Sequence, residues 1–124
     1  MRLLLDTHVV LWWLADSPAL SGQAASAIER GGGYVSAASV WEIAIKRALG
    51  KLEAPEDLAE VVDASNLLRL PIQFEHALIV GALPHHHRDP FDRMLIAQAQ
   101  HEGLTLVTSD ALIMRYPVRV LPAS

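Results

Sequence analysis

The sequence Arg2-Leu3-Leu4-Leu5-Asp6-Thr7-His8 decides the fold, because a short apolar run passes through one acidic residue directly into a helical segment. We expect Arg2–Leu5 to form a buried strand and His8–Ala15, which is rich in Val, Leu and Trp, to form a helix. Short strands separated by helices are typical of a parallel sheet that is covered by helices on both faces. The expected fold class is therefore α/β.

The same alternation continues to the end of the chain, with Gly31–Gly33 and Gly50 closing helices and Pro90 opening one. There is no internal repeat and no linker long enough to divide the chain, so a single α/β domain over residues 1–124 is expected. The further helices are expected at Ser21–Arg30, Val40–Leu49, Pro55–Ala64, Glu75–Ala82, Pro90 to about Gly103, and Ala111–Arg115, and the further strands at Tyr34–Ser36, Leu67–Leu70, Leu104–Val107 and Val118–Leu121.

The composition limits the possible classes of protein. A chain of 124 residues that is 52% hydrophobic has enough apolar side chains for one compact domain and too many for intrinsic disorder. It has no cysteine, which excludes a disulfide framework and a thiolate metal site. The longest apolar run, Val9–Ala15, is too short to span a membrane, and Asp6 and His8 interrupt the signal-peptide-like start. We therefore expect a soluble, cytoplasmic protein.

The net charge restricts the substrate. Fourteen acidic and ten basic residues leave a net charge of −4, whereas a protein that only coats nucleic acid usually carries a basic excess. A polyanionic substrate would need a local basic rim or a bound cation to offset this charge.

Acidic residues lie where the expected strands pass into helices. Asp6 directly follows the first strand, and Asp110 follows the strand that ends at Val107. Glu42 lies in the first turn of the expected third helix, and Asp89 and Asp92 flank the proline that opens the later helix. Ligands of open parallel sheets bind beyond the carboxyl ends of the strands, so these acids are expected to gather at one functional edge.

Each acid also has an interpretation as a helix cap. Ser39-Val40-Trp41-Glu42 matches a capping box, and Asp89-Pro90-Phe91-Asp92 matches an N-cap, a proline at the first helical position and an acid two residues later. Asp6 and Asp110 could each cap the helix that follows. Carboxylates near a helix N-terminus are favoured by about 0.3–1 kcal/mol. For any one acid alone, capping is the favoured interpretation.

Taken together, the acids favour a metal site. Several carboxylates at one edge repel one another and raise each other's pKa, and a divalent cation such as Mg²⁺ or Mn²⁺ relieves that repulsion. A cation held there also polarises a phosphoryl oxygen and lowers the pKa of an attacking water. The pattern therefore predicts metal-dependent phosphodiester hydrolysis, and the cation removes the objection raised by the net charge.

Four segments carry motifs in a fixed order: Leu4–His8, Val35–Lys46, Asp89–Arg93 with Leu95-Ile96-Ala97, and Val107–Asp110. In order and spacing, these segments resemble PIN-domain proteins of the VapC toxin type. The resemblance covers essentially the whole chain, and although each motif alone is weak, the ordered set is specific. It implies a small three-layer α/β/α ribonuclease that cuts single-stranded or loop RNA with Mg²⁺ or Mn²⁺. It also implies a small antitoxin that wraps the toxin and blocks its site, and a homodimer.

The resemblance assigns the family's four acids to Asp6, Glu42, Asp92 and Asp110. Asp92 fits the third place because it begins the helix pattern Asp92-Arg93-Met94-Leu95-Ile96-Ala97, but Asp89 could share or take that role. Under this hypothesis Asp6, Asp92 and Asp110 hold one or two cations, directly or through water. Glu42 completes the site or orients the water, whose in-line attack leaves a 5′-phosphate and a 3′-hydroxyl.

Neighbouring polar residues are further candidates for the site. Thr7 and Ser109 could bond a metal-bound water or a phosphate, or could be simple caps. Arg93 and Lys46 lie one residue or one helical turn from site acids and are candidates for contacts with RNA phosphates. Lys46 is also spaced for an ion pair with Glu42 one turn earlier on the helix.

Two further groups of residues receive other interpretations. Adjacent imidazoles project in different directions, so His85–His87 is expected to be a solvated loop near the substrate entrance and not a metal site. Trp12 and Trp13 could stack on bases, but in an apolar helix they are better explained as core or dimer-interface residues. The expected third helix offers more apolar residues for such an interface, namely Ile45, Leu49 and Leu52.

Two alternatives to the nuclease remain. A signalling receiver domain also has a parallel sheet and an acidic Mg²⁺ site, but it needs paired acids after the first strand and a lysine after the last. Here a single acid, Asp6, follows the first strand, and no lysine follows Val118. The second alternative is a PIN-like protein that only binds, in which the acids have become caps.

Overall fold

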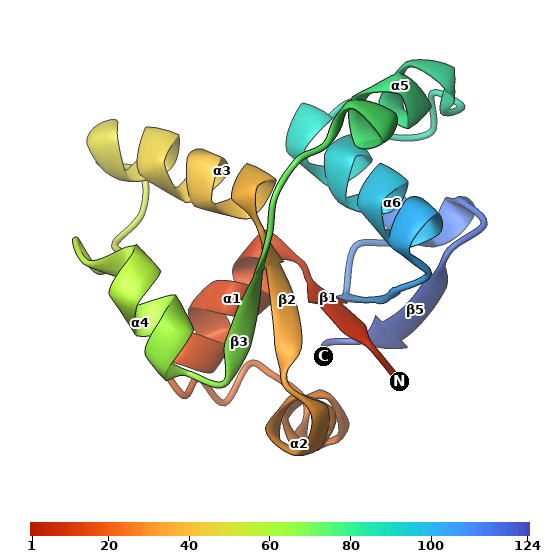
Figure 1. The fold of residues 1–124 in the computed structure, drawn as a ribbon. Helices are drawn as coiled ribbons and strands as arrows, with labels where there is room; N and C mark the ends of the chain where they lie inside the picture. Colours follow the sequence, from red (N-terminus) through yellow and green to blue (C-terminus); the bar gives the residue numbers. More distant parts are fainter.

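The computed structural model describes residues 1–124, and its centre is one parallel sheet of five strands (Figure 1). The strand order is β3-β2-β1-β4-β5, so the first strand lies in the middle. Every neighbouring pair is parallel, as the alternation of strands and helices predicts. The strands are β1 (Leu3–Leu5), β2 (Gly33–Ser36), β3 (Leu67–Leu70), β4 (Thr105–Thr108) and β5 (Arg119–Pro122).

Helices connect the strands and cover both faces of the sheet (Figure 1). This arrangement confirms the expected α/β class and its three layers. No helix is both long enough and apolar enough to cross a membrane. The helices are α1 (Thr7–Leu14), α2 (Gly22–Gly31), α3 (Ala37–Ala48), α4 (Leu58–Ala64), α5 (Phe74–Ala82) and α6 (Pro90–Glu102), followed by the 3-10 turn η1 (Ile113–Arg115).

A separate apolar core lies on each face of the sheet, because alternate residues of a strand point to opposite faces. In β1, Leu3 and Leu5 belong to the first core, together with residues of α1, α2, α3 and α4. Leu4 belongs to the second core, together with residues of α6. All three leucines are at most 2% exposed, which explains why the strand is apolar at every position. The two cores hold the carboxyl ends of β1 and β4 side by side.

Helix boundaries differ from the sequence prediction at functionally relevant places. Helix α3 begins at Ala37 and not at Val40, because the Ser36 side chain accepts a hydrogen bond from the backbone N–H of Ala38 at 3.0 Å. Glu42 therefore lies in the second turn, and the predicted Ser39–Glu42 capping box does not form. The expected Ala111–Arg115 helix is reduced to the short turn η1, and α4 begins at Leu58 after the predicted start at Pro55.

Candidate active site at the carboxyl edge of the sheet

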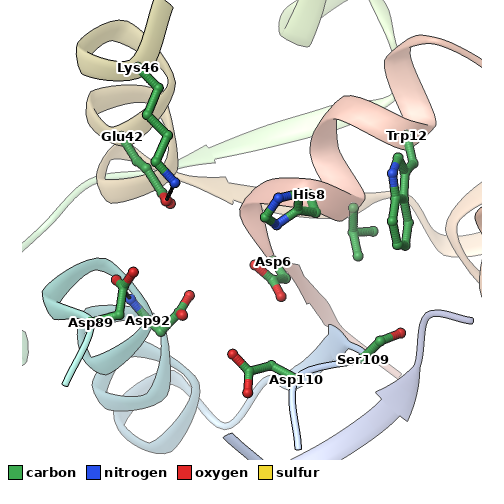
Figure 2. A pocket seen from close by; sticks show the side chains of 10 residues that line it. Asp6, His8, Trp12, Glu42, Lys46, Asp89, Asp92, Ser109 and Asp110 are labelled. Carbon is green, nitrogen blue, oxygen red and sulfur yellow. Dashed lines mark hydrogen bonds and ion pairs between the residues drawn. The ribbon is translucent and has the colours of Figure 1, made fainter. Parts of the chain in front are cut away.

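The carboxyl ends of the central strands open into a pocket of about 350 Å³. Its walls come from the turn after β1, from α1 and α3, from the start of α6 and from the turn after β4 (Figure 2). The acids that the sequence predicted to share one edge all line this pocket, namely Asp6, Glu42, Asp89, Asp92 and Asp110.

Asp6 points into the pocket and does not cap a helix. It occupies the N-cap position of α1, but its side chain makes no capping hydrogen bond. Its Oδ2 instead accepts a hydrogen bond from the hydroxyl of Thr108 at 2.6 Å, which ties the end of β1 to the end of β4. Burial raises the pKa of Asp6, and the Thr108 hydrogen bond opposes that rise. For this residue the capping interpretation is wrong.

Glu42 brings a buried carboxylate from α3 to the opposite wall. Its Oε2 accepts from Lys46 Nζ at 2.6 Å, which is the ion pair expected from their spacing. Its Oε1 is buried and has no hydrogen-bond partner. A buried carboxylate oxygen without a partner is costly, and a cation or an ordered water in the pocket would satisfy it.

Asp89 and Asp92 have different roles, as their hydrogen bonds show. Asp89 is the N-cap of α6, and its Oδ1 accepts from the backbone N–H groups of Phe91 at 2.8 Å and Asp92 at 3.0 Å. Asp92 caps nothing. Its pKa is raised to about 7, first by burial and then by the nearby charges of Asp6 and Asp89. The structure thus gives Asp89 a capping role and leaves the Asp92 carboxylate turned toward the other acids (Figure 2).

Asp110 lies in the turn after β4, and hydrogen bonds hold both of its carboxylate oxygens. Its Oδ1 accepts from the backbone N–H of Leu112 at 2.8 Å, and its Oδ2 lies 2.9 Å from His87 Nε2. Burial alone would raise the pKa of Asp110, but the hydrogen bonds from His87 and Leu112 lower it overall. Asp110 is therefore ionised in the pH range below about 7 where Asp92 still holds its proton.

His87 is the functional residue that the sequence interpretation missed. The expectation of a solvated loop fits His85, which is exposed, but His87 is only 8% exposed. Its Nε2 lies 2.9 Å from Asp110 Oδ2 and 3.0 Å from Asp92 Oδ2. Burial would lower the pKa of His87, but the hydrogen bond to Asp110 and the charge of Asp92 raise it overall. The sequence signal that could have indicated this role is that His87 lies two residues before Asp89, the N-cap of α6.

Arg93 does not face substrate, so its predicted contact with RNA phosphates is wrong. It is 8% exposed, and its guanidinium donates hydrogen bonds to backbone carbonyls at the end of α5 and in the segment between α5 and α6. Its Nη2 donates to Val80 O at 2.9 Å, and its Nη1 donates to Pro84 O at 2.9 Å and to His87 O at 3.3 Å. The side chain therefore holds this segment against α6.

The two candidate hydroxyl residues differ in position. Thr7 is buried outside the pocket and donates to the hydroxyl of Ser39 at 2.9 Å, so it joins α1 to α3 and does not reach a ligand there. Ser109 does line the pocket, and its hydroxyl is 2.6 Å from that of Ser124. Only Ser109 is placed to contact a bound group.

The tryptophans also divide between core and pocket. Trp13 packs against the first core and donates from Nε1 to Ser65 O at 3.3 Å, as expected for a structural residue. Trp12 packs against the same core but also lines the pocket, next to His8. Trp12 and His8 thus form the one aromatic wall of an otherwise acidic pocket (Figure 2).

The donor set of the pocket fits a hard divalent cation. Mg²⁺ and Mn²⁺ prefer carboxylate oxygens and water, and the pocket offers both carboxylates and open volume. The unpartnered Oε1 of Glu42 and the raised pKa of Asp92 show a site with more negative charge than its own residues balance. Lys46, the only lysine or arginine in the lining, is already paired with Glu42.

The fold and this acidic pocket define a class of protein, and the chain belongs to the PIN domain family, whose model matches residues 3–118. It is 36% identical over 116 residues to Ribonuclease VapC22 of Mycobacterium tuberculosis, an alignment that covers 86% of this chain and 85% of the relative. Because the chain belongs to this family, it is not a signalling receiver domain.

Solved structures share the fold at low sequence identity. The crystal structure of VapBC2 from Rickettsia felis, bound to a DNA fragment from their promoter, contains a chain that matches with a TM-score of 0.74 and 16% identity over 100% of both chains. DNA-bound VapBC from Salmonella typhimurium matches with a TM-score of 0.73 and 21% identity, covering 98% of this chain and 97% of that chain. These matches establish the three-layer fold of the chain.

Proposed function

We propose that this protein is a metal-dependent endoribonuclease, the toxin of a type II toxin–antitoxin pair, that hydrolyses RNA phosphodiester bonds in the acidic pocket. The observation that carries the proposal is the convergence of four carboxylates from separate elements on one pocket of a PIN domain (Figure 2). The relative named a ribonuclease supports RNA as the substrate. The four residues are Asp6, Glu42, Asp92 and Asp110.

Asp6, Asp92 and Asp110 are the residues that would hold Mg²⁺ or Mn²⁺, directly or through water. When bound there, the cation would supply charge for the phosphate, polarise a phosphoryl oxygen and acidify a water molecule. Glu42 Oε1 is buried and free, and it is the group best suited to orient that water for in-line attack. The expected products carry a 5′-phosphate and a 3′-hydroxyl.

Other residues of the lining bind and orient the substrate. Lys46 pairs with Glu42, yet its side chain is 38% exposed, so it remains a candidate for a contact with an RNA phosphate. Ser109 and the second oxygen of Asp89 lie at the same edge and support the site. Trp12 offers a ring on which a base can stack.

The proposal includes a cognate antitoxin and a homodimer. Solved VapBC and other toxin–antitoxin complexes with this fold support a protein partner for this chain. Exposed apolar side chains on and directly after α3 support a second copy, with Trp41 61% exposed and Leu49 62% exposed. The proposal assigns the activity to one domain over residues 1–124 and the protein to the cytoplasm.

Cleavage of a labelled mixed-sequence RNA by antitoxin-free protein tests the proposal. We expect cuts with Mg²⁺ or Mn²⁺ that are absent with EDTA and in Asp6→Asn, a substitution that keeps the size of the side chain. His85→Ala, at an exposed position outside the pocket, is the matched control and should cleave normally. Cleavage that persists in EDTA or in Asp6→Asn would contradict the mechanism, and metal binding without cleavage of any RNA would favour a PIN-like protein that only binds.

A further inference from the structure

His87 connects two carboxylates of the pocket without lining the pocket itself. Its Nε2 lies within hydrogen-bond distance of Asp110 Oδ2, at 2.9 Å, and of Asp92 Oδ2, at 3.0 Å. Both aspartates line the pocket, whereas His87 does not, and its side chain is 10% exposed. The imidazole therefore contacts the two carboxylates from the protein side.

The other ring nitrogen fixes which atom carries the proton. Nδ1 of His87 accepts a hydrogen bond from the backbone N–H of Asp89 at 3.2 Å, so it has no proton of its own. A neutral imidazole that accepts at Nδ1 carries its proton on Nε2. Nε2 thus donates to Asp110 Oδ2, and the positive end of the same N–H lies beside Asp92 Oδ2, 3.0 Å from Nε2. The same bond argues against His87 as a metal ligand, because coordination through Nε2 would move the proton to Nδ1, against the N–H of Asp89.

The loop that carries His87 is tied down at several points. The backbone N–H of His87 donates to the hydroxyl of Tyr116 at 2.9 Å, and that hydroxyl donates to Pro84 O at 2.7 Å. Arg93 Nη1 donates to the carbonyl oxygens of both Pro84 and His87. A ring held by this network has a fixed position, which suits a residue that orients others.

We propose that His87 is a positioning residue that clamps Asp92 and Asp110 together for cation binding. Its Nε2–H donates to Asp110 Oδ2 and lies 3.0 Å from Asp92 Oδ2, which offsets the repulsion between the two carboxylates when both are ionised and leaves the pocket side of the pair to a cation. Carboxylates that bind metals are commonly held by such outer hydrogen bonds, and losing one typically lowers metal affinity about 10–100-fold. This inference rests on the proposed metal-dependent function and names a residue outside its four acids.

Calorimetric titration with Mn²⁺ at one fixed pH, on the full chain, tests the clamp. His87→Asn keeps an acceptor for the Asp89 N–H but is too short to donate to the carboxylates, so we expect about 10–100-fold weaker Mn²⁺ binding. His87→Gln places an N–H near the position of Nε2 and should recover most of the affinity. His85→Ala, an exposed histidine of the same loop, should bind as wild type does. A purely structural role would not separate Asn from Gln in affinity.

Nitrogen NMR of the wild-type imidazoles provides a second measurement that needs no variant. We expect the His87 proton on Nε2 both without metal and with saturating Mg²⁺. A proton that moves to Nδ1 on addition of Mg²⁺ would make His87 a ligand and overturn the clamp.

The remaining outcomes are distinguishable. Wild-type affinity in His87→Asn, or tighter binding, overturns the clamp and leaves the proposed nuclease standing. If wild type itself binds no Mn²⁺ and cleaves no RNA with it, the metal-dependent function fails and the clamp fails with it.

Discussion

Asp92 is the acid whose ionisation is most altered by the fold. Burial and the charges of Asp6 and Asp89 raise its pKa to about 7, whereas an ordinary aspartate titrates near 3.8. The folded protein therefore binds a proton at Asp92 more tightly than the unfolded chain does. The protonated carboxyl stabilises the fold fully below about pH 3.8, and this contribution is lost as the pH rises through about 7.

The first prediction concerns the stability of the metal-free protein as the pH rises. The contribution of Asp92 is complete below its unfolded pKa and is lost as the pH passes through about 7, so Tm should fall between about pH 5 and pH 8. Asp92→Asn removes the ionisation and should flatten this part of the curve. Circular dichroism melts in EDTA check it, and an unchanged slope in the variant would contradict the assignment. His87, whose pKa is also raised, contributes in the same direction and leaves a residual slope.

Arg93 gives a second prediction at the scale of one residue, on stability and not on RNA binding. Truncation to Ala would leave the carbonyls of Leu83 and His87 without donors, at about 1–3 kcal/mol each before relaxation, and would also remove one of the two donors to Val80 O and to Pro84 O. We expect Arg93→Ala to lower the free energy of unfolding by at least about 2 kcal/mol in urea titrations. Arg30→Ala, at an exposed position, should change it by less than about 0.5 kcal/mol. Near-native stability of Arg93→Ala would show that the segment is held by other contacts.

The two candidate acids at the start of α6 differ in whether their side chains accept hydrogen bonds from the backbone of the helix. Asp89 caps the helix through its Oδ1, whereas Asp92 makes no such bond. Asp89→Ala should therefore cost about 0.5–2 kcal/mol of stability through loss of the cap. Asp92→Asn should instead stabilise the metal-free protein at about pH 8, because it removes a buried charge. Urea titrations of both variants at that pH check the contrast, and destabilisation by Asp92→Asn would reverse the roles assigned to the two acids.

The elements also show how far the sequence predicts the site. The order of strands and helices placed Asp6 and Asp110 at one edge, because parallel strands share a carboxyl end whatever the details of packing. The start of α3 was wrong by three residues, since both Ser36 and Ser39 are suitable caps and only the sheet end at Ser36 decides between them. His87 was missed because its burial depends on Tyr116 and on the guanidinium of Arg93, a contact network that no local spacing encodes.

At the scale of the whole molecule, the sheet order brings together acids from opposite ends of the chain. β1 and β4 are neighbours, and the Thr108 hydroxyl donates to Asp6 across that junction. Acids held so close repel one another. Three features reduce this repulsion: the raised pKa of Asp92, the hydrogen bond from His87 to Asp110 and the ion pair between Lys46 and Glu42. The region of greatest electrostatic cost is thus also the proposed reaction site, and a cation should relieve that cost.

Cation binding should consequently stabilise the folded protein more at high pH than at low pH. A ligand that binds only the folded state at 100 times its Kd adds about 2.7 kcal/mol to the free energy of unfolding. Below about pH 7 a proton on Asp92 competes with the cation, so the rise in Tm with Mg²⁺ or Mn²⁺ should be larger at about pH 8 than at about pH 6. Melts with and without the cation at both pH values measure this difference. Asp6→Asn should lose most of the stabilisation at either pH, and Lys51→Ala, an exposed residue outside the pocket, should keep all of it. An equal rise in Tm at both pH values would mean that the cation does not bind at Asp92.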